Sequence, residues 1–132
     1  MKSVTIIAED KVGLLADISY VLAKSRINID SVNVDIVSKN AVISLGISDP
    51  KKGKEVLESA GYKVDTNALV IRTKKENVEE IKAELQKKGV KISEMNLLCE
   101  DEEVQIYSMA VDKKKRAAEV LAQFLITNES DY

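Results

Sequence analysis

The sequence contains no histidine and no tryptophan, and Cys99 is its single cysteine among 132 residues. Histidine is the commonest general acid or base near neutral pH, so its absence removes the usual Ser-His and Cys-His nucleophile pairs. One cysteine forms no disulfide within the chain, and without histidine it does not complete the usual zinc sites. We therefore expect no metal and no other cofactor, and we expect that the protein is not an enzyme.

The sequence also lacks a long apolar run and an excess of charge of one sign. It carries 20 Lys and Arg residues against 22 Asp and Glu residues, for a net charge of −2, which gives no electrostatic footprint for nucleic acid. No run approaches the roughly 20 apolar residues that cross a membrane. Glu9 and Asp10 interrupt the apolar start of the chain before it is long enough for a signal peptide. We expect a cytoplasmic protein that binds neither nucleic acid nor membranes.

An internal repeat organises the apolar residues that are present. Stretches with helical and strand periodicity alternate in one order, and this order occurs twice. An offset of 63 residues, as between Ile18 and Ile81 or between Ile29 and Ile92, aligns the two halves. The sequence therefore predicts two copies of one small architecture, with domains at residues 1–66 and 67–132.

The first half predicts strands and helices in the order βαββαβ. Apolar residues recur at helical spacing from Leu14 to Leu22, and a second helix follows Asp49-Pro50, where Asp is the N-cap and proline takes the first helical position. The apolar phase slips near Asp30-Ser31, which predicts a β-bulge. The four strands are expected at residues 4–8, 28–37, 41–47 and 62–64.

The second half predicts the same order with a shorter end. Its strands are expected at residues 68–72, 91–99 and 104–111, and Asp112 is expected to cap its last helix. After that helix only residues 126–127 have strand character, and residues 128–132 are polar. We predict an α+β fold of two ferredoxin-like βαββαβ repeats, with helices on one face of antiparallel sheets and the last strand of the second repeat lacking or short.

The turn between the first strand and first helix differs between the halves. In the first half an acidic turn with Gly13 enters the helix without a sealed cap, which leaves N–H groups for a small anion. In the second half Thr73 and Glu76 have the spacing of a capping box, and Glu76 stands at the position of Gly13. We therefore expect the first repeat to bind a ligand and the second to be structural.

The residues of the first half resemble an ACT domain. The resemblance rests on Asp10-Lys11-Val12-Gly13-Leu14-Leu15, on the helix positions Ile18 and Leu22, and on Ile27-Asn28-Ile29-Asp30. It covers the whole first half, whereas the second half matches in architecture but not at the turn. The chain as a whole resembles a stand-alone tandem of ACT repeats. Val12 stands where many members have proline, and Asp10 where serine-binding members tend to have asparagine.

The resemblance implies a regulatory module that binds a free amino acid at an interface between paired ACT domains. It implies a homodimer or higher homo-oligomer, and a regulated metabolic enzyme as a further partner. The ligand site that it implies consists of residues from the turn and from the start of the second strand: Asp10, Lys11, Val12, Gly13, Leu14, Leu15, Asn28, Ile29 and Asp30.

The chemistry of these residues fits an amino acid. The N–H groups from Gly13 to Leu15 are donors for a carboxylate, and Asp10 is an acceptor for an ammonium group. A structural role competes in each case: Asp10 as a helix N-cap, Asn28 as the start of a strand, and Asp30 as a stabiliser of the bulge. Two alternative functions also stay open, a ligand-free module for protein interaction or oligomerisation, and an enzyme that uses Lys and Asp.

Basic residues gather at the start of the second helix of each half, at Lys51, Lys52 and Lys54 and at residues 113–116. The sequence around Gly53-Lys54 does not match a phosphate-binding loop. We expect solvent-exposed faces at both places, although cations are unfavourable near helix N-termini.

Overall fold

The computed structural model describes residues 2–127. The first repeat follows the predicted order, and its elements begin and end within three residues of the predictions. They are β1 (Lys2–Glu9), α1 (Leu14–Lys24), β2 (Ile29–Val37), β3 (Asn40–Ile47), α2 (Pro50–Ser59) and β4 (Lys63–Asp65). The four strands form one antiparallel sheet in the order β2-β3-β1-β4. The predicted bulge is confirmed, because the register of β2 against β3 shifts between Ile29 and Ser31.

The second repeat contains the same elements with a reduced end. It consists of β5 (Leu69–Lys74), a 3₁₀ turn η1 (Lys75–Asn77), α3 (Val78–Lys87), β6 (Ile92–Glu100), β7 (Val104–Val111) and α4 (Lys114–Val120). Its three strands pair in the order β5-β7-β6. In place of a fourth strand, the Arg72 N–H donates to the Phe124 carbonyl at 2.9 Å, and an isolated bridge joins Ile71 to Leu125. The shortened last strand is therefore confirmed, and the polar residues 128–132 lie outside the described part of the chain.

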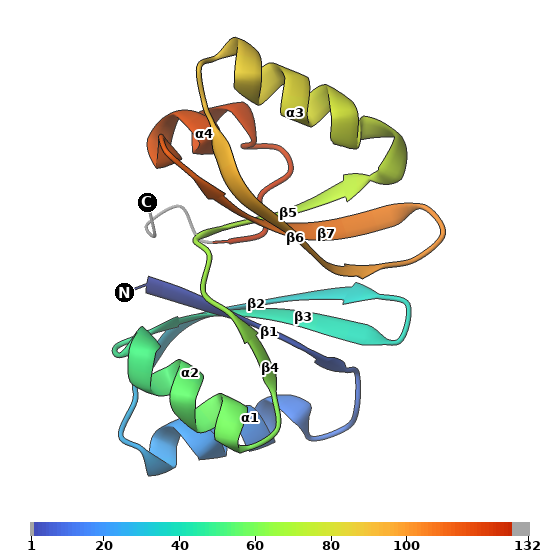
Figure 1. Ribbon diagram of the computed structural model, residues 1–132. Coiled ribbons are helices and arrows are strands. Elements are labelled where there is room, and N and C mark those ends of the chain that lie inside the picture. The colour runs from blue at the N-terminus through green and yellow to red at the C-terminus, as the bar shows by residue number, and fades with distance from the viewer. Residues whose placement is uncertain (1, 128–132) are drawn as a thin grey trace.

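The two repeats stack through their sheets, as Figure 1 shows. Helices α1 and α2 cover the outer face of one sheet, and α3 and α4 cover the outer face of the other, so the molecule has four layers. Each repeat has its own core between helices and sheet. A third cluster joins the repeats between the two sheets, and its buried members are Val37, Val42, Val70, Leu98 and Ile106.

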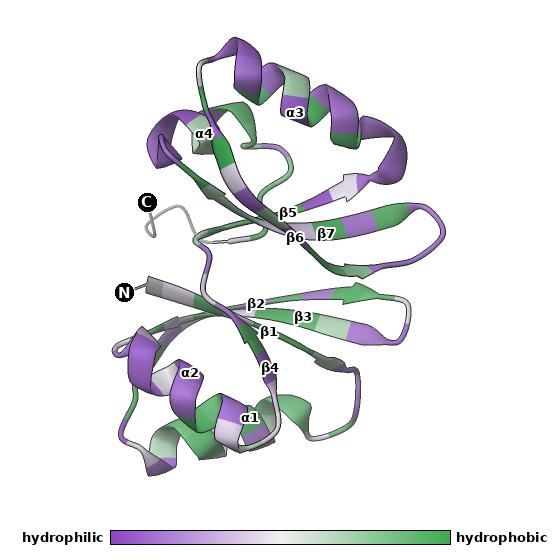
Figure 2. Ribbon diagram, viewed as in Figure 1, coloured by the Kyte–Doolittle hydropathy of each residue, from purple (hydrophilic) through white to green (hydrophobic). Residues whose placement is uncertain are grey.

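Polar contacts accompany this third cluster. The Arg72 guanidinium lies 3.2 Å from the Asp35 carboxylate and donates to the Ile36 carbonyl at 3.1 Å. Elsewhere between the repeats, the Ser108 hydroxyl donates to Asp65 at 2.8 Å. In Figure 2 hydrophilic residues dominate the outer surface of α3, while hydrophobic residues run along the strands. Inter-sheet burial and these directed bonds together fix how the repeats stack.

The two helix caps predicted from aspartate behave differently. Asp49 caps α2 as predicted, because its Oδ1 accepts from the Lys52 N–H at 3.1 Å. The prediction for Asp112 is wrong: α4 begins after Lys113 without a side-chain cap, and Asp112 accepts from the Lys91 N–H at 2.8 Å. The physical reason is that the start of β6 lies beside the end of β7, so an unpaired N–H from another segment reaches the carboxylate.

The basic residues near α4 have a use that the sequence does not reveal. The Lys113 ammonium donates to the Gly89 carbonyl at 2.6 Å, and the Arg116 guanidinium donates to the Lys88 carbonyl at 3.2 Å. Both carbonyls lie just beyond α3, where the helix dipole favours positive charge. These two cations thus cap the C-terminus of α3, which offsets their unfavourable place beside the N-terminus of α4.

Candidate functional site

The turn from β1 into α1 is built around a glycine in the left-handed region. Gly13 has a φ of 85°, which L side chains rarely adopt, and a Cβ added there would meet no atom within 4 Å. Helix α1 begins after Gly13 with no side-chain cap, which confirms the prediction of an unsealed helix start. The first N–H groups of the helix therefore have no side-chain acceptor from the cap residue.

Backbone hydrogen bonds fix the shape of this turn. The Asp10 N–H donates to the Lys39 carbonyl at 2.8 Å and so ties the turn to the β2–β3 hairpin. The Leu14 N–H donates to the Lys11 carbonyl at 3.2 Å, and the Asp17 N–H donates to the Gly13 carbonyl at 2.9 Å. These bonds fix the backbone of the turn and use the N–H groups of Leu14 and Asp17, while the N–H groups between them belong to the first turn of the helix, which lacks intrahelical acceptors.

A hollow of about 430 Å³ lies beside the turn. From the predicted site, Lys11, Val12, Gly13 and Leu14 line it. Asp10 and Leu15 flank these four residues in the chain and are exposed, but they do not line the hollow. The structure therefore brings together the middle of the predicted turn and leaves its two ends at the rim.

Charged groups of both signs surround this hollow. Lys11 and Lys63 contribute ammonium groups, and Glu9 and Asp17 contribute carboxylates. An exposed ion pair joins Lys11 to Glu9 at 3.8 Å. Since a free amino acid carries one carboxylate and one ammonium, a groove with both kinds of partner matches its charge pattern.

Tyr62 closes one side of the hollow and holds a carboxylate in place. Its hydroxyl donates to Asp17. Partial burial, together with this hydrogen bond and the negative charge of Asp17, raises the pKa of Tyr62 to about 12. Tyr62 therefore remains a protonated donor at neutral pH and orients the Asp17 carboxylate at the entrance of α1.

Within one chain, Asn28, Ile29 and Asp30 lie at the other end of the sheet from the turn. Ile29 pairs with Ile47, which pairs in turn with Lys2 at the start of β1. The turn follows Glu9 at the opposite end of β1, eight residues away along an extended strand. A single copy of the chain therefore does not combine the two predicted parts of the site.

Local contacts occupy Asn28 and Asp30 in part. The Asn28 N–H donates to the Ser48 hydroxyl at 3.0 Å, and its carbonyl accepts from the Ser48 N–H at 3.0 Å. The Asp30 carboxylate accepts from the Ser31 hydroxyl at 3.3 Å and covers Gly46, where a Cβ would collide with it. These contacts fit the structural alternative for Asp30, which is stabilisation of the bulge.

Four charged or polar residues that line the hollow are absent from the predicted site, and they are Glu9, Asp17, Tyr62 and Lys63. Glu9 and Asp17 lie within four residues of Gly13 in the chain, whereas Tyr62 and Lys63 come almost 50 residues later. The sheet topology could have indicated Tyr62 and Lys63. Because β4 pairs with β1 in antiparallel register, from Thr5 with Asp65 to Ile7 with Lys63, the start of β4 must lie beside the end of β1.

The corresponding turn of the second repeat does not contain the predicted capping box. Strand β5 continues to Lys74, so Thr73 is an extended, buried strand residue whose hydroxyl donates to the Lys74 carbonyl at 3.2 Å. Glu76 lies in η1, and α3 begins after Asn77 without a side-chain cap. The prediction was wrong because pairing of Lys74 with Val104 extends the strand past the expected helix start.

Carboxylates dominate the surroundings of this second turn. Glu76, Glu102 and Glu103 line the hollow beside it together with Lys74 and Lys75. Lys75 is itself engaged, because its ammonium lies 3.0 Å from Glu100 and lowers the pKa of that carboxyl. An anionic ligand would meet an excess of negative charge here, whereas lysines and carboxylates are equal in number around the first turn.

Residues 2–127 also lack two features of other kinds of protein. No helix in this range is long and apolar enough to cross a membrane. In the same range, no group of three or more Cys, Asp or Glu side chains is placed to hold a metal ion.

Comparisons with known proteins agree with this architecture. A family model for the ACT domain matches residues 2–59. A structure of a protein from Bacteroides thetaiotaomicron is similar over 98% of this chain and 92% of its own, with 22% identity and a TM-score of 0.51, and this shows a shared fold. The ligand-free regulatory subunit of aspartate kinase from Thermus thermophilus matches 92% of this chain and 90% of its own, with 13% identity and a TM-score of 0.48. A comparison with curated proteins gave no match.

Proposed function

We propose, from the premise that residues 2–59 belong to the ACT domain family, that this protein is a regulatory module that binds a free amino acid at the Gly13 turn. It acts without catalysing a reaction, in the reducing cytoplasm that a single cysteine favours. Residues 1–66 form the binding repeat and residues 67–132 form a structural repeat. The observation that carries the proposal is the open, glycine-based start of α1 beside a groove that offers both ammonium and carboxylate groups.

The chemistry of the groove supports an amino acid in one orientation. Its carboxylate would accept from the N–H groups at the start of α1, where the helix dipole and Lys11 add positive charge. Its ammonium would lie near Glu9 or Asp17, both of which line the same hollow. Val12 and Leu14 supply apolar surface for a small or branched side chain.

An exposed apolar stripe on β2 supports pairing with a second copy. Val32, Val34 and Ile36 are 47%, 44% and 44% exposed. They lie on the helix-covered face of the sheet. On that face they pair across the strands with the buried β3 residues Leu45, Ile43 and Ala41. Strand β2 is an edge of its sheet among the described strands. An apolar, unpaired edge of this kind is typical of an interface.

Pairing of two β2 edges would also complete the site. In an antiparallel pair the start of one β2 lies beside the end of the other. The end of β2 at Val37 pairs with Asn40, which pairs with Glu9 just before the Gly13 turn. A two-fold dimer would therefore bring Asn28 of a second copy to the end of the sheet that carries the turn.

Regulation follows from a ligand that contacts both copies. An amino acid held by the turn of one copy and by Asn28 of the other binds the dimer better than the monomer, so it shifts the population toward the dimer. A metabolic enzyme that recognises only one of the two states would then respond to the concentration of the amino acid.

A screen of all twenty amino acids by thermal shift tests the proposal. A ligand at 100 times its Kd stabilises by roughly 2.7 kcal/mol, which raises the Tm by several degrees for a chain of this size. The matched variants are Gly13→Asp and Gly13→Asn, since both side chains tolerate the left-handed region and differ in charge. We expect Gly13→Asp to abolish the shift and Gly13→Asn to retain part of it. Equal shifts in the wild type and in Gly13→Asp would contradict the proposal.

The second candidate function is a ligand-free module for protein interaction or oligomerisation. The exposed stripe of Val32, Val34 and Ile36 favours it independently of any ligand. Sedimentation with and without each amino acid separates the two functions. A dimer that forms equally in every condition, with no thermal shift, would favour the ligand-free module.

A further inference from the structure

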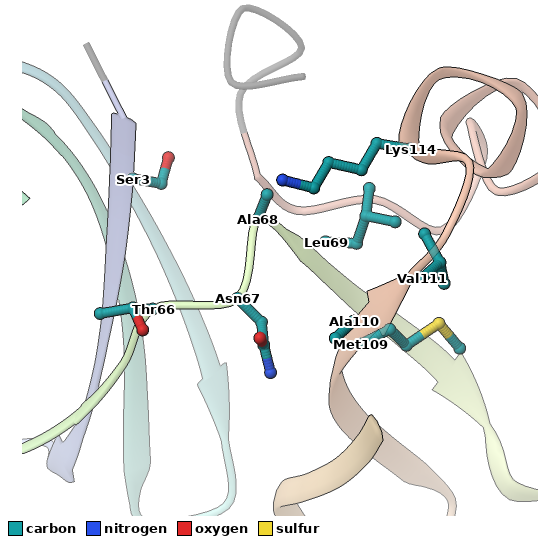
Figure 3. A pocket seen from close by; sticks show the side chains of 9 residues that line it. All are labelled: Ser3, Thr66, Asn67, Ala68, Leu69, Met109, Ala110, Val111 and Lys114. Atoms are coloured by element: carbon teal, nitrogen blue, oxygen red, sulfur yellow. The ribbon is translucent and has the colours of Figure 1, made fainter. Parts of the chain in front are cut away.

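A cavity of about 190 Å³ lies at the junction of the two repeats, far from the Gly13 turn. Figure 3 shows it between β1 on one side and β5, β7 and the start of α4 on the other. Ser3 from β1 and the linker residues Thr66 and Asn67 form its polar wall. Pockets for drug-sized molecules measure about 300–1,000 Å³, so this cavity suits a smaller metabolite.

The opposite wall is apolar and belongs to the core of the second repeat. Leu69 and Met109 are each 1% exposed and pair with one another across β5 and β7. Val111 continues this surface toward α4. Because these side chains come from paired strands, the wall is rigid and accepts an aliphatic group without rearrangement.

Hydrogen bonds also fix the linker that forms the polar wall. The Asn67 N–H donates to Asp65 at 2.8 Å, and its side-chain amide donates to the Ser108 hydroxyl at 3.3 Å. Ser108 in turn donates to the second oxygen of Asp65 at 2.8 Å. The Asp65 carboxylate is thus engaged by two partners, and it does not line the cavity.

Among residues 2–127, Lys114 is the one charged residue that lines this cavity. Its neighbours Lys113 and Arg116 are bound to carbonyls beyond α3, whereas the Lys114 side chain extends toward Ala68 and the linker in Figure 3. Within residues 2–127, no carboxylate lies within ion-pair distance of Lys114. Within the described part of the chain, the cavity therefore has a cation and neutral polar side chains in its lining, but no acid to receive an ammonium group.

We propose that this cavity is a second ligand site, which takes a small aliphatic monocarboxylate, such as a branched-chain acid, and not an amino acid. The carboxylate lies against Lys114 with Ser3 and Thr66 nearby, and the aliphatic chain lies on Leu69, Met109 and Val111. The ligand touches both repeats, so its binding stabilises their stacking. This site is independent of the proposed amino-acid site, whose groove contains carboxylates as well as lysines.

Calorimetric titration of the full chain with 3-methylbutanoate tests this site. We expect saturable binding to the wild type and at least tenfold weaker binding to Lys114→Gln, because that variant loses a charged partner of the carboxylate. Lys115→Gln is the matched control, since Lys115 is exposed and does not line the cavity. Ala68→Leu, which places a larger side chain at the linker wall, should also remove binding.

Further probes decide the class of the ligand and its location. The neutral isostere 3-methylbutanamide and inorganic phosphate should each bind at least tenfold more weakly than 3-methylbutanoate, because the first lacks the charge and the second lacks the aliphatic chain. Binding should persist in Gly13→Asp, which removes only the amino-acid site. The proposal is overturned if the wild type does not bind 3-methylbutanoate, if Lys114→Gln and Lys115→Gln bind it alike, or if phosphate binds as tightly.

Discussion

In the first repeat the chain leaves its opening strand at Glu9 and enters the helix through a left-handed glycine, whereas in the second repeat the strand runs on to Lys74 and a 3₁₀ turn follows. Neither helix has a side-chain cap. The difference therefore lies in access and charge. The first turn is open above Gly13 and has two lysines and two carboxylates beside it. The second has two lysines and three carboxylates, which are Glu76, Glu102 and Glu103. One architecture thus carries an open glycine turn in one copy and a more acidic 3₁₀ turn in the other.

The exposed edge strands of the two sheets also differ, and the difference favours pairing through the first repeat. Val34 on β2 and Leu97 on β6 are equivalent positions, and they are 44% and 40% exposed. Strand β2 keeps a regular register from Ser31 to Val37. Strand β6 has shifts between Ile92 and Glu94 and between Leu97 and Cys99. Since bulges disrupt the ladder, the edge of the first repeat is the better template for pairing.

The largest expected effect comes from a substitution between the sheets. Ile106 is fully buried in the cluster that joins the two repeats, so Ile106→Ala should cost about 2–5 kcal/mol, as such core truncations do. The second repeat has one strand fewer, so hydrogen exchange should show that β5–β7 lose protection before β1 and β3. Urea denaturation measures the total loss. Ile106→Val, with an expected cost of about 0.5–1.5 kcal/mol, is the matched control. Equal loss of protection in both sheets would contradict the expected order.

The next effect concerns dimer formation and the two edges. Val34→Lys should weaken the proposed dimer at least tenfold, about 1.4 kcal/mol, because a charged side chain on an edge opposes pairing. Leu97→Lys, at the equivalent position of the irregular edge, should leave the dimer unchanged. Sedimentation across a concentration series measures both. If the two variants dissociate alike, or if neither does, β2 is not the interface.

A smaller effect distinguishes Asp49 from Asp112, which occupy equivalent positions in the two repeats. Asp49→Ala removes the cap of α2 and should cost about 1 kcal/mol. Its local signature is faster hydrogen exchange at Lys52, whose N–H loses its acceptor. Asp112→Ala should instead speed exchange at Lys91, at the start of β6. Faster exchange in the first turn of α4 in Asp112→Ala would show that Asp112 caps that helix after all.

The smallest effect is a dependence on acid in the second repeat. The Lys75 ammonium lowers the pKa of Glu100, the N–H groups of Val104 and Glu103 lower that of Asp101, and the Lys91 N–H lowers that of Asp112. A carboxyl whose pKa is lower in the folded state stabilises the fold above its unfolded pKa, and this stabilisation is lost as the pH falls through the folded value. From about pH 5 to about pH 3, therefore, protection of β6 and β7 should fall.

Asp101→Asn is the control for this acid effect. It keeps an oxygen that can accept from the Glu103 and Val104 N–H groups, at 2.8 and 2.7 Å in the wild type, but it does not titrate. Hydrogen exchange near the β6–β7 turn should then depend less on pH than in the wild type. An unchanged pH profile would show that Asp101 does not contribute to the acid response.

Much of the fold could be predicted from periodicity, because each sheet of this chain has one face against its own helices. Strand and helix order, the bulge after Ile29, the Asp49 cap and the short end of the second repeat all followed from local patterns. The capping box at Thr73 and the cap at Asp112 did not hold. In both places a strand neighbour distant in sequence took the backbone group or side chain that the local motif required.

The candidate site shows the same division. The turn from Lys11 to Leu14 followed from its glycine and from the helix pattern, since a left-handed residue and an uncapped helix are local properties. Tyr62 and Lys63 join it only because β4 pairs with β1, whereas Asp17 lies one helical turn after Gly13. No local pattern indicated that Asn28 lies at the far end of the sheet.

The sequence by itself determined the two repeats, their order of strands and helices, and the glycine turn, because these depend on side-chain spacing within a few turns of chain. Only the tertiary structure decided that the repeats stack through their sheets, that Lys113 and Arg116 cap α3, and that a cavity opens beside Lys114. These features join residues that are distant in the chain. Which of those residues meet depends on packing and on strand register, and neither is encoded in any single segment.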